Sequence, residues 1–171
     1  PIAFPPQHQP VQPGLESLMK PVPITEDPAY RGSGKLEGKV AIVTGGDSGI
    51  GKAVAIAFAK EGADLVIPYL YETSDAEVTK ARIEQHGQRC IPIKIDLRYK
   101  KNCEAVIRQT LAEFGRLDVL VNNHGVQYVQ QSILDITEEQ LYQTYQTNIF
   151  PFFFMIQAAL PHLKAGASII N

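Results

Sequence analysis

Short runs of consecutive apolar residues alternate with longer amphipathic stretches from residue 35 to residue 171, and this alternation limits the fold more than any other feature. The runs span residues 40–43, 65–67, 90–95, 117–121 and 167–170. Strands that are buried on both faces of a sheet have this nearly continuous apolar character. Because consecutive parallel strands need a helix between them, the sequence predicts an α/β fold with a five-stranded parallel sheet and helices on both faces.

Four helices are expected between these strands, at residues 49–61, 74 to about 87, 100–114 and 137 to about 163. Ser-Asp-Ala-Glu at 74–77 and Thr-Glu-Glu-Gln at 137–140 match the capping box of a helix N-terminus. Pro151 has no N–H for the carbonyl of Thr147, so the fourth helix should kink beside Asn148. We hypothesise that the opened turn helps to seat a water molecule there; a kink without a role is the alternative.

A proline in the third apolar run indicates where that strand lies in the sheet. Pro92 cannot donate a ladder hydrogen bond, so it is tolerated only at an edge or a bulge. The doubly wound strand order 3-2-1-4-5-6 places the third strand at an edge. Since five strand signals are present, the predicted order is 3-2-1-4-5.

Residues 1–34 differ from the rest of the chain, because eight of its twelve prolines lie at or before Pro28. Proline fixes φ and removes donors, so this segment cannot form a helix or a sheet. We interpret it as an extended, partly polyproline-like arm that lies on the body or on a partner subunit, anchored by Leu15, Leu18 and Met19. A disordered tail is the alternative, and residues 35–171 form the predicted nucleotide-binding domain.

The composition excludes several classes of protein. The formal net charge of −2 argues against binding to nucleic acid through a basic surface. No apolar run approaches the roughly 18 residues of a membrane helix, and the first residues lack the features of a secretory signal. Two cysteines are too few for a disulfide framework, so we expect a cytoplasmic protein. The four scattered histidines predict no metal site.

Glycines follow the first strand with the spacing of a phosphate-binding loop. Gly45 permits a tight turn, Gly49 lets a pyrophosphate approach the backbone, and Gly51 lets the next helix pack on the sheet. The N-terminus of that helix offers free N–H groups and a positive dipole end to the phosphates. Such a triple alone is weak evidence, but here it lies between a strand and a helix. A turn without a ligand is the alternative.

Three motifs resemble those of the short-chain dehydrogenase/reductase (SDR) family. Thr-Gly-x-x-x-Gly-Ile-Gly at 44–51 resembles the family's cofactor loop. Asn-Asn-His-Gly at 122–125 resembles its Asn-Asn-Ala-Gly, with His124 in place of Ala, and Thr-Asn-Ile-Phe at 147–150 resembles the segment with its active-site Asn. The Pro- and Gln-rich start resembles a bacterial subgroup with an N-terminal extension. The resemblance implies a Rossmann-type, doubly wound sheet that binds NAD or NADP.

The resemblance also implies roles for individual residues. The glycine loop would hold the pyrophosphate and the adenosine ribose, and Asp96 would accept from the adenine amino group, with an N-cap of the next helix as the alternative. Asn123 would border the cofactor and tie the fourth strand to its neighbours, whereas contact of His124 with the cofactor or substrate is the less favoured reading. The cofactor-binding candidates are Gly45, Asp47, Ser48, Gly49, Ile50, Gly51, Tyr69, Leu70, Asp96, Leu97, Asn123, His124, Gly125 and Asn148.

Asn148 is the one catalytic candidate, because it matches the Asn of the family's Asn-Ser-Tyr-Lys set. No tyrosine in the chain has a lysine four residues later. The family's Ser and Tyr-x-x-x-Lys would follow the fifth strand, so we interpret the chain as truncated before them. The resemblance implies that the parent protein is an enzyme (EC 1.1.1.-) that transfers hydride between a nicotinamide cofactor and a carbonyl or secondary alcohol. The 171-residue chain itself is expected to be inactive.

The choice between NAD and NADP depends on the end of the second strand. NAD-preferring members usually have an acid there, but the matching residue is Tyr69 and Glu72 is displaced. NADP-preferring members usually have Arg or Lys in the loop, where this chain has Ser48. Since Asp47 would repel a 2′-phosphate, the sequence slightly favours NAD.

Aromatic residues at 150 and 152–154 surround the last helix, and such a helix is buried on all sides. In the SDR family this helix commonly meets a second subunit, so we expect a homo-oligomer, a dimer or a tetramer. A non-catalytic nucleotide-binding half-domain with a regulatory or interaction role is the alternative function. A flavodoxin-like or sugar-nucleotide domain is disfavoured, because the motifs at 122–125 and 147–148 have no reason to occur there.

Overall fold

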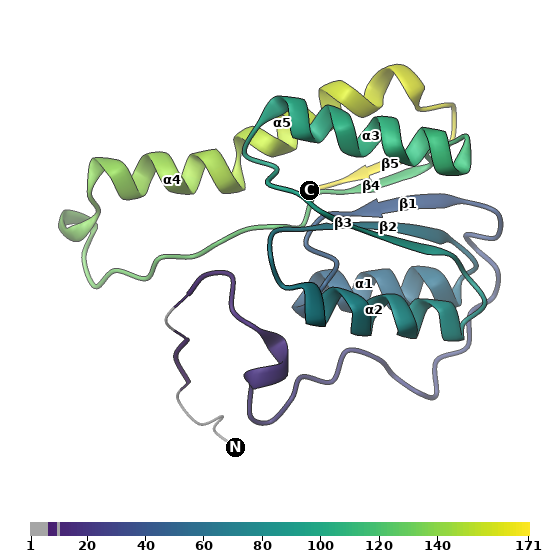
Figure 1. Cartoon of the computed structure of the whole chain (residues 1–171), viewed down its shortest axis with the longest axis horizontal. Coiled ribbons are helices and arrows are strands. Elements are labelled where there is room, and N and C mark those ends of the chain that lie inside the picture. Colours follow the sequence, from purple (N-terminus) through teal and green to yellow (C-terminus); the bar gives the residue numbers. More distant parts are fainter. Residues whose placement is uncertain (1–6, 10) are drawn as a thin grey trace.

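The computed structural model describes residues 7–9 and 11–171, which form a parallel sheet covered by helices (Figure 1). The sheet has five strands in the order β3-β2-β1-β4-β5. The fold class and the strand order predicted from the sequence are therefore confirmed, and β3 lies at an edge as Pro92 indicated. The strands are β1 (Val40–Val43), β2 (Asp64–Tyr69), β3 (Cys90–Lys94), β4 (Val119–Val121) and β5 (Ser168–Ile170).

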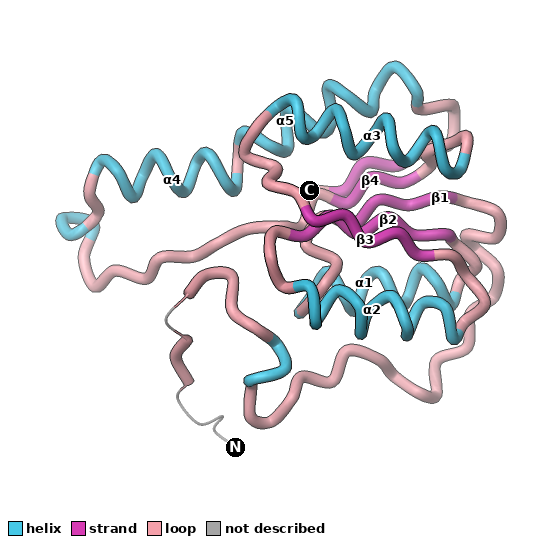
Figure 2. The backbone as a smooth tube through the Cα atoms, in the orientation of Figure 1, coloured by secondary structure: helices cyan, strands magenta, loops and turns pink. Residues whose placement is uncertain are grey.

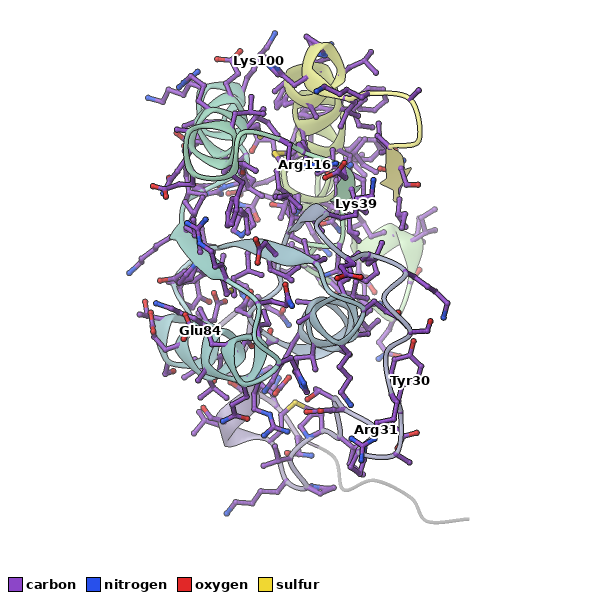
Figure 3. The ribbon with its side chains drawn as sticks, turned by 90° about the vertical axis from the view of Figure 1, so that its right-hand side faces the viewer. Tyr30, Arg31, Lys39, Glu84, Lys100 and Arg116 are labelled. Carbon is purple, nitrogen blue, oxygen red and sulfur yellow. The ribbon has the colours of Figure 1, made fainter. Side chains whose placement is uncertain are left out.

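Helices cover both faces of the sheet (Figure 2). One layer contains α1 (Gly49–Lys60) and α2 (Thr73–Gln85), and the opposite layer contains α3 (Lys100–Phe114) and α5 (Phe150–Ala159). An end-on view shows the sheet between a layer with Lys100 and a layer with Glu84 (Figure 3). The remaining helices are α4 (Glu138–Asn148), which projects beyond the sheet, and the short 3₁₀ turns η1 (Glu16–Leu18), η2 (Ile133–Asp135) and η3 (Leu160–His162).

Two apolar clusters explain why the strands are continuously apolar. Ala41 and Val43 of β1 pack with α1 and α2, whereas Ile42 packs with α3 and α5. All three side chains are fully buried. A buried Val or Ile side chain contributes about 1.5–3 kcal/mol to the free energy of unfolding. Because alternate residues of β1 face opposite layers, a polar residue at any of these positions would destabilise the packing of one layer.

One of the two predicted capping boxes is present only in part, and the other is absent. The Thr137 side chain accepts from the Gln140 N–H at 3.1 Å, which confirms this start of α4. The box predicted at 74–77 is wrong, because α2 begins at Thr73 and has no side-chain cap. The carboxylate of Asp75 instead accepts a hydrogen bond from the backbone of Glu16.

The helix expected from 137 to about 163 is broken where Pro151 predicted a kink. α4 ends at Asn148 and α5 begins at Phe150, with Ile149 between them at φ −119° and ψ −59°. The carbonyl of Thr147 loses its donor four residues later because proline has no N–H. The break is confirmed, and the water molecule beside Asn148 remains a prediction.

Candidate cofactor site

A cleft of about 450 Å³ lies at the carboxyl ends of the central strands. This edge of an open parallel sheet is where ligands bind. The sequence-predicted residues that line the cleft are Gly45, Asp47, Ser48, Ile50, Tyr69, Leu70, Asp96, Leu97, Asn123, His124 and Gly125. Gly49, Gly51 and Asn148 do not line it. The cleft also includes Glu72, which the sequence analysis considered as a displaced acid, Thr147 from the third motif, and residues that the sequence did not indicate: Gln12, Pro13, Pro68, Ile95, Arg98, Val126 and Tyr128.

The glycine loop is packed so closely that side chains are excluded from it. Gly45 has a φ of +64°, a conformation that favours glycine. A Cβ added at Gly51 would lie 2.1 Å from the carbonyl oxygen of Gly45 and 2.6 Å from Nδ2 of Asn123. No described atom lies within 4 Å of a Cβ position at Gly49. The loop is thus packed against the sheet at Gly51, whereas the side of Gly49 where a Cβ would lie is open.

Asn123 fixes the loop after β4 to the loop after β1. Its backbone N–H donates to Oγ1 of Thr44 at 2.9 Å, and its Nδ2 donates to the Thr44 carbonyl at 3.0 Å. The predicted tie between β4 and its neighbour is confirmed by these bonds. They hold the two loops that form the centre of the cleft in one arrangement.

His124 is a neutral group in the wall of the cleft. Its Nδ1 lies 2.8 Å from Oγ1 of Thr44, and its ring meets Phe152 edge-on at 5.3 Å. Burial lowers the pKa of His124 to about 4, although the nearby Thr147 carbonyl and Asp96 act in the opposite direction. Nε2 is buried and has no partner among the described residues. The ring is therefore uncharged at neutral pH.

Asp47 is an acid with an unusual protonation behaviour. Its side chain accepts from the Ser48 hydroxyl at 2.9 Å, and the residue is 4% exposed. Burial raises the pKa of Asp47 to about 6, with smaller contributions from the charges of Glu72 and Asp75, whereas the Ser48 hydroxyl lowers it. Asp47 therefore carries most of a negative charge at neutral pH and loses it in mild acid.

Asp96 is paired with a cation that the sequence did not indicate. Nε and Nη2 of Arg98 donate to its carboxylate at 3.0 and 2.7 Å. Burial acts to raise the pKa of Asp96, but Arg98 outweighs it and the net shift is downward. The alternative role of Asp96 as an N-cap is wrong, because the N-cap of α3 is Tyr99. Arg98 could have been found only from its place two residues after a predicted site acid.

Asn148 supports the cleft from behind. Its Oδ1 accepts from the Val126 N–H at 2.9 Å, and its Nδ2 donates to the Val126 carbonyl at 2.7 Å. Both hydrogen bonds act on the segment after β4, which contributes Gly125 and Val126 to the cleft. The side chain thus positions that wall.

No group of three or more His, Cys, Asp or Glu side chains that could hold a metal ion occurs among the described residues. Within residues 7–9 and 11–171, no helix is both long and apolar enough to cross a membrane.

Comparison with known proteins identifies the family of this fold and cleft. A family model described as short chain dehydrogenase matches residues 39–171. The chain belongs to the short-chain dehydrogenase family. This finding confirms the family that the three motifs predicted.

Relatives within the short-chain dehydrogenase family extend well beyond the matched region. The uncharacterized oxidoreductase YhdF of Bacillus subtilis is 59% identical over 166 residues, which are 97% of this chain and 57% of YhdF. Glucose and ribitol dehydrogenase of Daucus carota is 44% identical over 174 residues, 98% of this chain and 60% of that protein. The chain therefore spans less than two thirds of the length of these relatives.

A solved short-chain dehydrogenase has the same architecture. The enzyme from Burkholderia cenocepacia, crystallised in complex with NADP, superposes with a TM-score of 0.75 at 36% identity. The match covers 79% of this chain and 55% of that protein.

Proposed function

We propose that the protein is an NAD(P)-dependent oxidoreductase that transfers hydride between a nicotinamide cofactor and a carbonyl or secondary alcohol. The observation that carries this proposal is the glycine loop, which opens on the cleft at the N-terminus of α1. Close packing at Gly51 draws the loop against the sheet, and Ser48 and Ile50, on either side of Gly49, line the cleft where a pyrophosphate would meet the N-terminus of α1. The bound cofactor would supply the hydride.

The lining residues can be assigned to the successive parts of a dinucleotide. Ser48 and Ile50 would hold the pyrophosphate, and Tyr69 and Leu70 would meet the adenosine ribose. Asp96 with Leu97 would border the adenine, and Asn123, His124 and Gly125 would border the nicotinamide end. Asn148 would act on the reaction by holding the segment after β4, and the water molecule proposed beside it would pass a proton.

We favour NAD over NADP because the cleft is poor in positive charge. The charged side chains that line it are three acids, Asp47, Glu72 and Asp96, and one cation, Arg98. Arg98 is already paired with Asp96. A 2′-phosphate near the end of β2 would therefore face Asp47 without a free cation among the described residues, and Coulomb repulsion would oppose it. The Burkholderia relative was crystallised with NADP, so the test includes both cofactors.

The remaining parts of the proposal concern the whole protein. We place the Ser and Tyr-x-x-x-Lys of the family beyond residue 171, and divide this chain into an arm at 1–34 and a domain at 35–171. Exposed apolar side chains on α4 and α5, such as Tyr142 and Phe153, support a homo-oligomer. Two free, buried thiols agree with a cytoplasmic location.

The test is a titration of the purified full-length protein with NADH and NADPH, followed by turnover assays with aldehydes, ketones and secondary alcohols. We expect saturable binding, a lower Kd for NADH and turnover of at least one class. Binding without turnover of any carbonyl or alcohol would favour a non-catalytic nucleotide-binding role. Failure to bind either cofactor would refute the proposal.

A further inference from the structure

The wall of the cleft is not built from the sheet domain alone. Gln12 and Pro13, which lie in the N-terminal arm, line it together with Tyr69 and Leu70 at the end of β2. The hydroxyl of Tyr71 donates to the Pro13 carbonyl at 2.7 Å. The arm therefore contacts the segment that follows β2, beside the part of the cleft where we place the adenosine ribose.

A buried carboxylate fastens the arm to the first turn of α1. Oε2 of Glu16 accepts from the Gly49 N–H at 2.6 Å, and Oε1 accepts from Nζ of Lys52 at 2.6 Å. The Glu16 N–H donates to Asp75 of α2 at 2.7 Å. Glu16 is 5% exposed. Since a carboxylate is favoured at a helix N-terminus and a buried charge must be paired, these contacts select one position for the arm.

The Gln9 side chain holds the backbone at Leu15, between the cleft-lining residues of the arm and this anchor. The side chain of Gln9 donates to the Leu15 carbonyl and accepts from the Leu15 N–H, each at 2.8 Å. We call the described residues 11–15, which carry Gln12 and Pro13, the arm loop. The two hydrogen bonds of Gln9 thus hold the end of the arm loop at Leu15.

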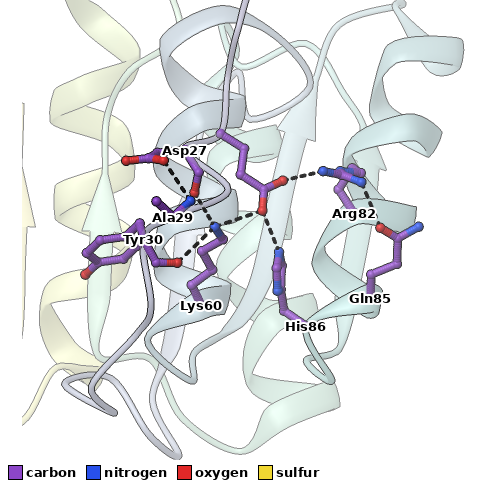
Figure 4. A network of polar contacts seen from close by, with 8 residues as sticks. Asp27, Ala29, Tyr30, Lys60, Arg82, Gln85 and His86 are labelled. Carbon is purple, nitrogen blue, oxygen red and sulfur yellow. Dashed lines mark hydrogen bonds and ion pairs between the residues drawn. The ribbon is translucent and has the colours of Figure 1, made fainter.

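A second anchor holds the later part of the arm at a different place. The Glu26 carboxylate pairs with Lys60 of α1 at 2.9 Å and also contacts Arg82 and His86 (Figure 4). None of these four residues lines the cleft. The molecule thus offers two acidic anchors of the same arm, of which Glu16 alone adjoins the glycine loop.

We propose that the arm loop is a binding element of the cofactor site, in which Gln12 hydrogen-bonds the adenosine ribose and Glu16 holds the loop in place. This inference rests on the proposed function. The Gln12 amide provides a donor and an acceptor on the side of the cleft where β2 ends in Tyr69 rather than in an acid. A neutral amide satisfies ribose hydroxyls without a charge. The ring of Pro13 fixes its own φ, which limits the entropy lost on binding.

The arm would weaken cofactor binding, rather than strengthen it, if Glu16 competed with the ligand. Its carboxylate takes the Gly49 N–H at the helix end where a pyrophosphate would bind. If the arm were inhibitory, removal of that charge would tighten binding. The sign of the change in Kd therefore separates a binding element from an autoinhibitory one.

The test measures the Kd of ADP-ribose, which has the adenosine half of the cofactor and no nicotinamide, by calorimetry on the full-length protein. We expect Gln12→Ala and Glu16→Gln each to raise this Kd about three- to tenfold, as the loss of one or two hydrogen bonds does. The matched control is Glu26→Gln, which weakens the other anchor and should leave the Kd unchanged. Because Gln12 is exposed, Gln12→Ala should fold normally. This variant therefore tests the proposal even if Glu16→Gln does not fold.

An unchanged Kd in Gln12→Ala, or a lower Kd in Glu16→Gln, would overturn the inference. A fall in affinity of equal size in Glu26→Gln would also contradict it, because the effect would then be general loosening of the arm. If the unaltered protein bound neither ADP-ribose nor NADH, the proposed function itself would fail.

Discussion

Two buried groups in the wall of the cleft should make folding stability depend on pH in opposite directions. The pKa of Asp47 is raised from 3.8 to about 6, and the pKa of His124 is lowered from 6.5 to about 4. Both shifts result mainly from burial, which disfavours the charged form of each group. Each shift of roughly two units corresponds to about 3 kcal/mol in the free energy of unfolding.

The sign of each contribution follows from its pKa in the folded and unfolded states. The contribution of Asp47 is complete below pH 3.8, where both states are protonated, and is lost as the pH rises through 6. The contribution of His124 is complete above pH 6.5 and is lost as the pH falls through 4. Between pH 4 and 6 the two changes nearly cancel, so the unaltered protein hides both.

Single substitutions should reveal the two slopes. We expect the stability of Asp47→Asn, relative to the unaltered protein, to rise by about 3 kcal/mol from pH 4 to 6.5. The relative stability of His124→Ala should fall by about the same amount over this range. Urea unfolding of the cofactor-free protein at a series of pH values measures both, and other titrating groups cancel in each difference. A flat difference for either variant would refute the assigned pKa of that residue.

The glycine loop, the support behind the cleft and the two thiols each carry a further prediction. Gly51→Ala forces a Cβ to within 2.1 Å of a backbone carbonyl, so it should abolish cofactor binding and lower the free energy of unfolding by about 1–3 kcal/mol. The control is Gly125→Ala, where an added Cβ makes only ordinary contacts and should change the free energy of unfolding by less than about 0.5 kcal/mol. Asn148→Ala should cost about 1–3 kcal/mol in urea unfolding because two hydrogen bonds to the backbone are lost; a cost near zero would contradict its positioning role. Burial raises the pKa of Cys90 and of Cys103 to about 12. Iodoacetamide at pH 8 should therefore label the peptides that contain them only after unfolding. Labelling of the native protein would contradict the burial of these thiols.

The strand order and the centre of the cleft could be predicted because their signals are local in the sequence. Pro92 is excluded from a central strand by its missing donor, and the glycines at 45, 49 and 51 reflect backbone conformation and close packing. Pro151 predicted the break between α4 and α5 for the same reason. Each of these residues constrains its own backbone, so no knowledge of a distant partner is needed.

Polar contacts between distant segments could not be predicted in this way. The capping box at 74–77 is absent because α2 begins at Thr73, one residue before the predicted cap Ser74. The Asp75 carboxylate binds the backbone of Glu16, 59 residues earlier, and nothing in the local sequence indicates this partner. Arg98 escaped notice for a related reason, since a charged residue in a turn is normally solvated and only the fold places it beside the cleft.

The anchor of the arm shows most clearly what the sequence pattern lacks. Apolar character favoured Leu18 and Met19 as anchors, but these side chains are 62% and 37% exposed, whereas Glu16 between Leu15 and these two is buried. A short arm on the surface of a domain can bury little apolar area, so hydrophobicity discriminates poorly among its residues. A carboxylate gains more there if it meets unpaired helix N–H groups and a lysine, and those partners lie at Gly49 and Lys52. The helix N-terminus at which we propose that a cofactor binds therefore also holds the arm. This sharing of one electropositive helix end is the physical basis for expecting the arm to affect the affinity of the cleft.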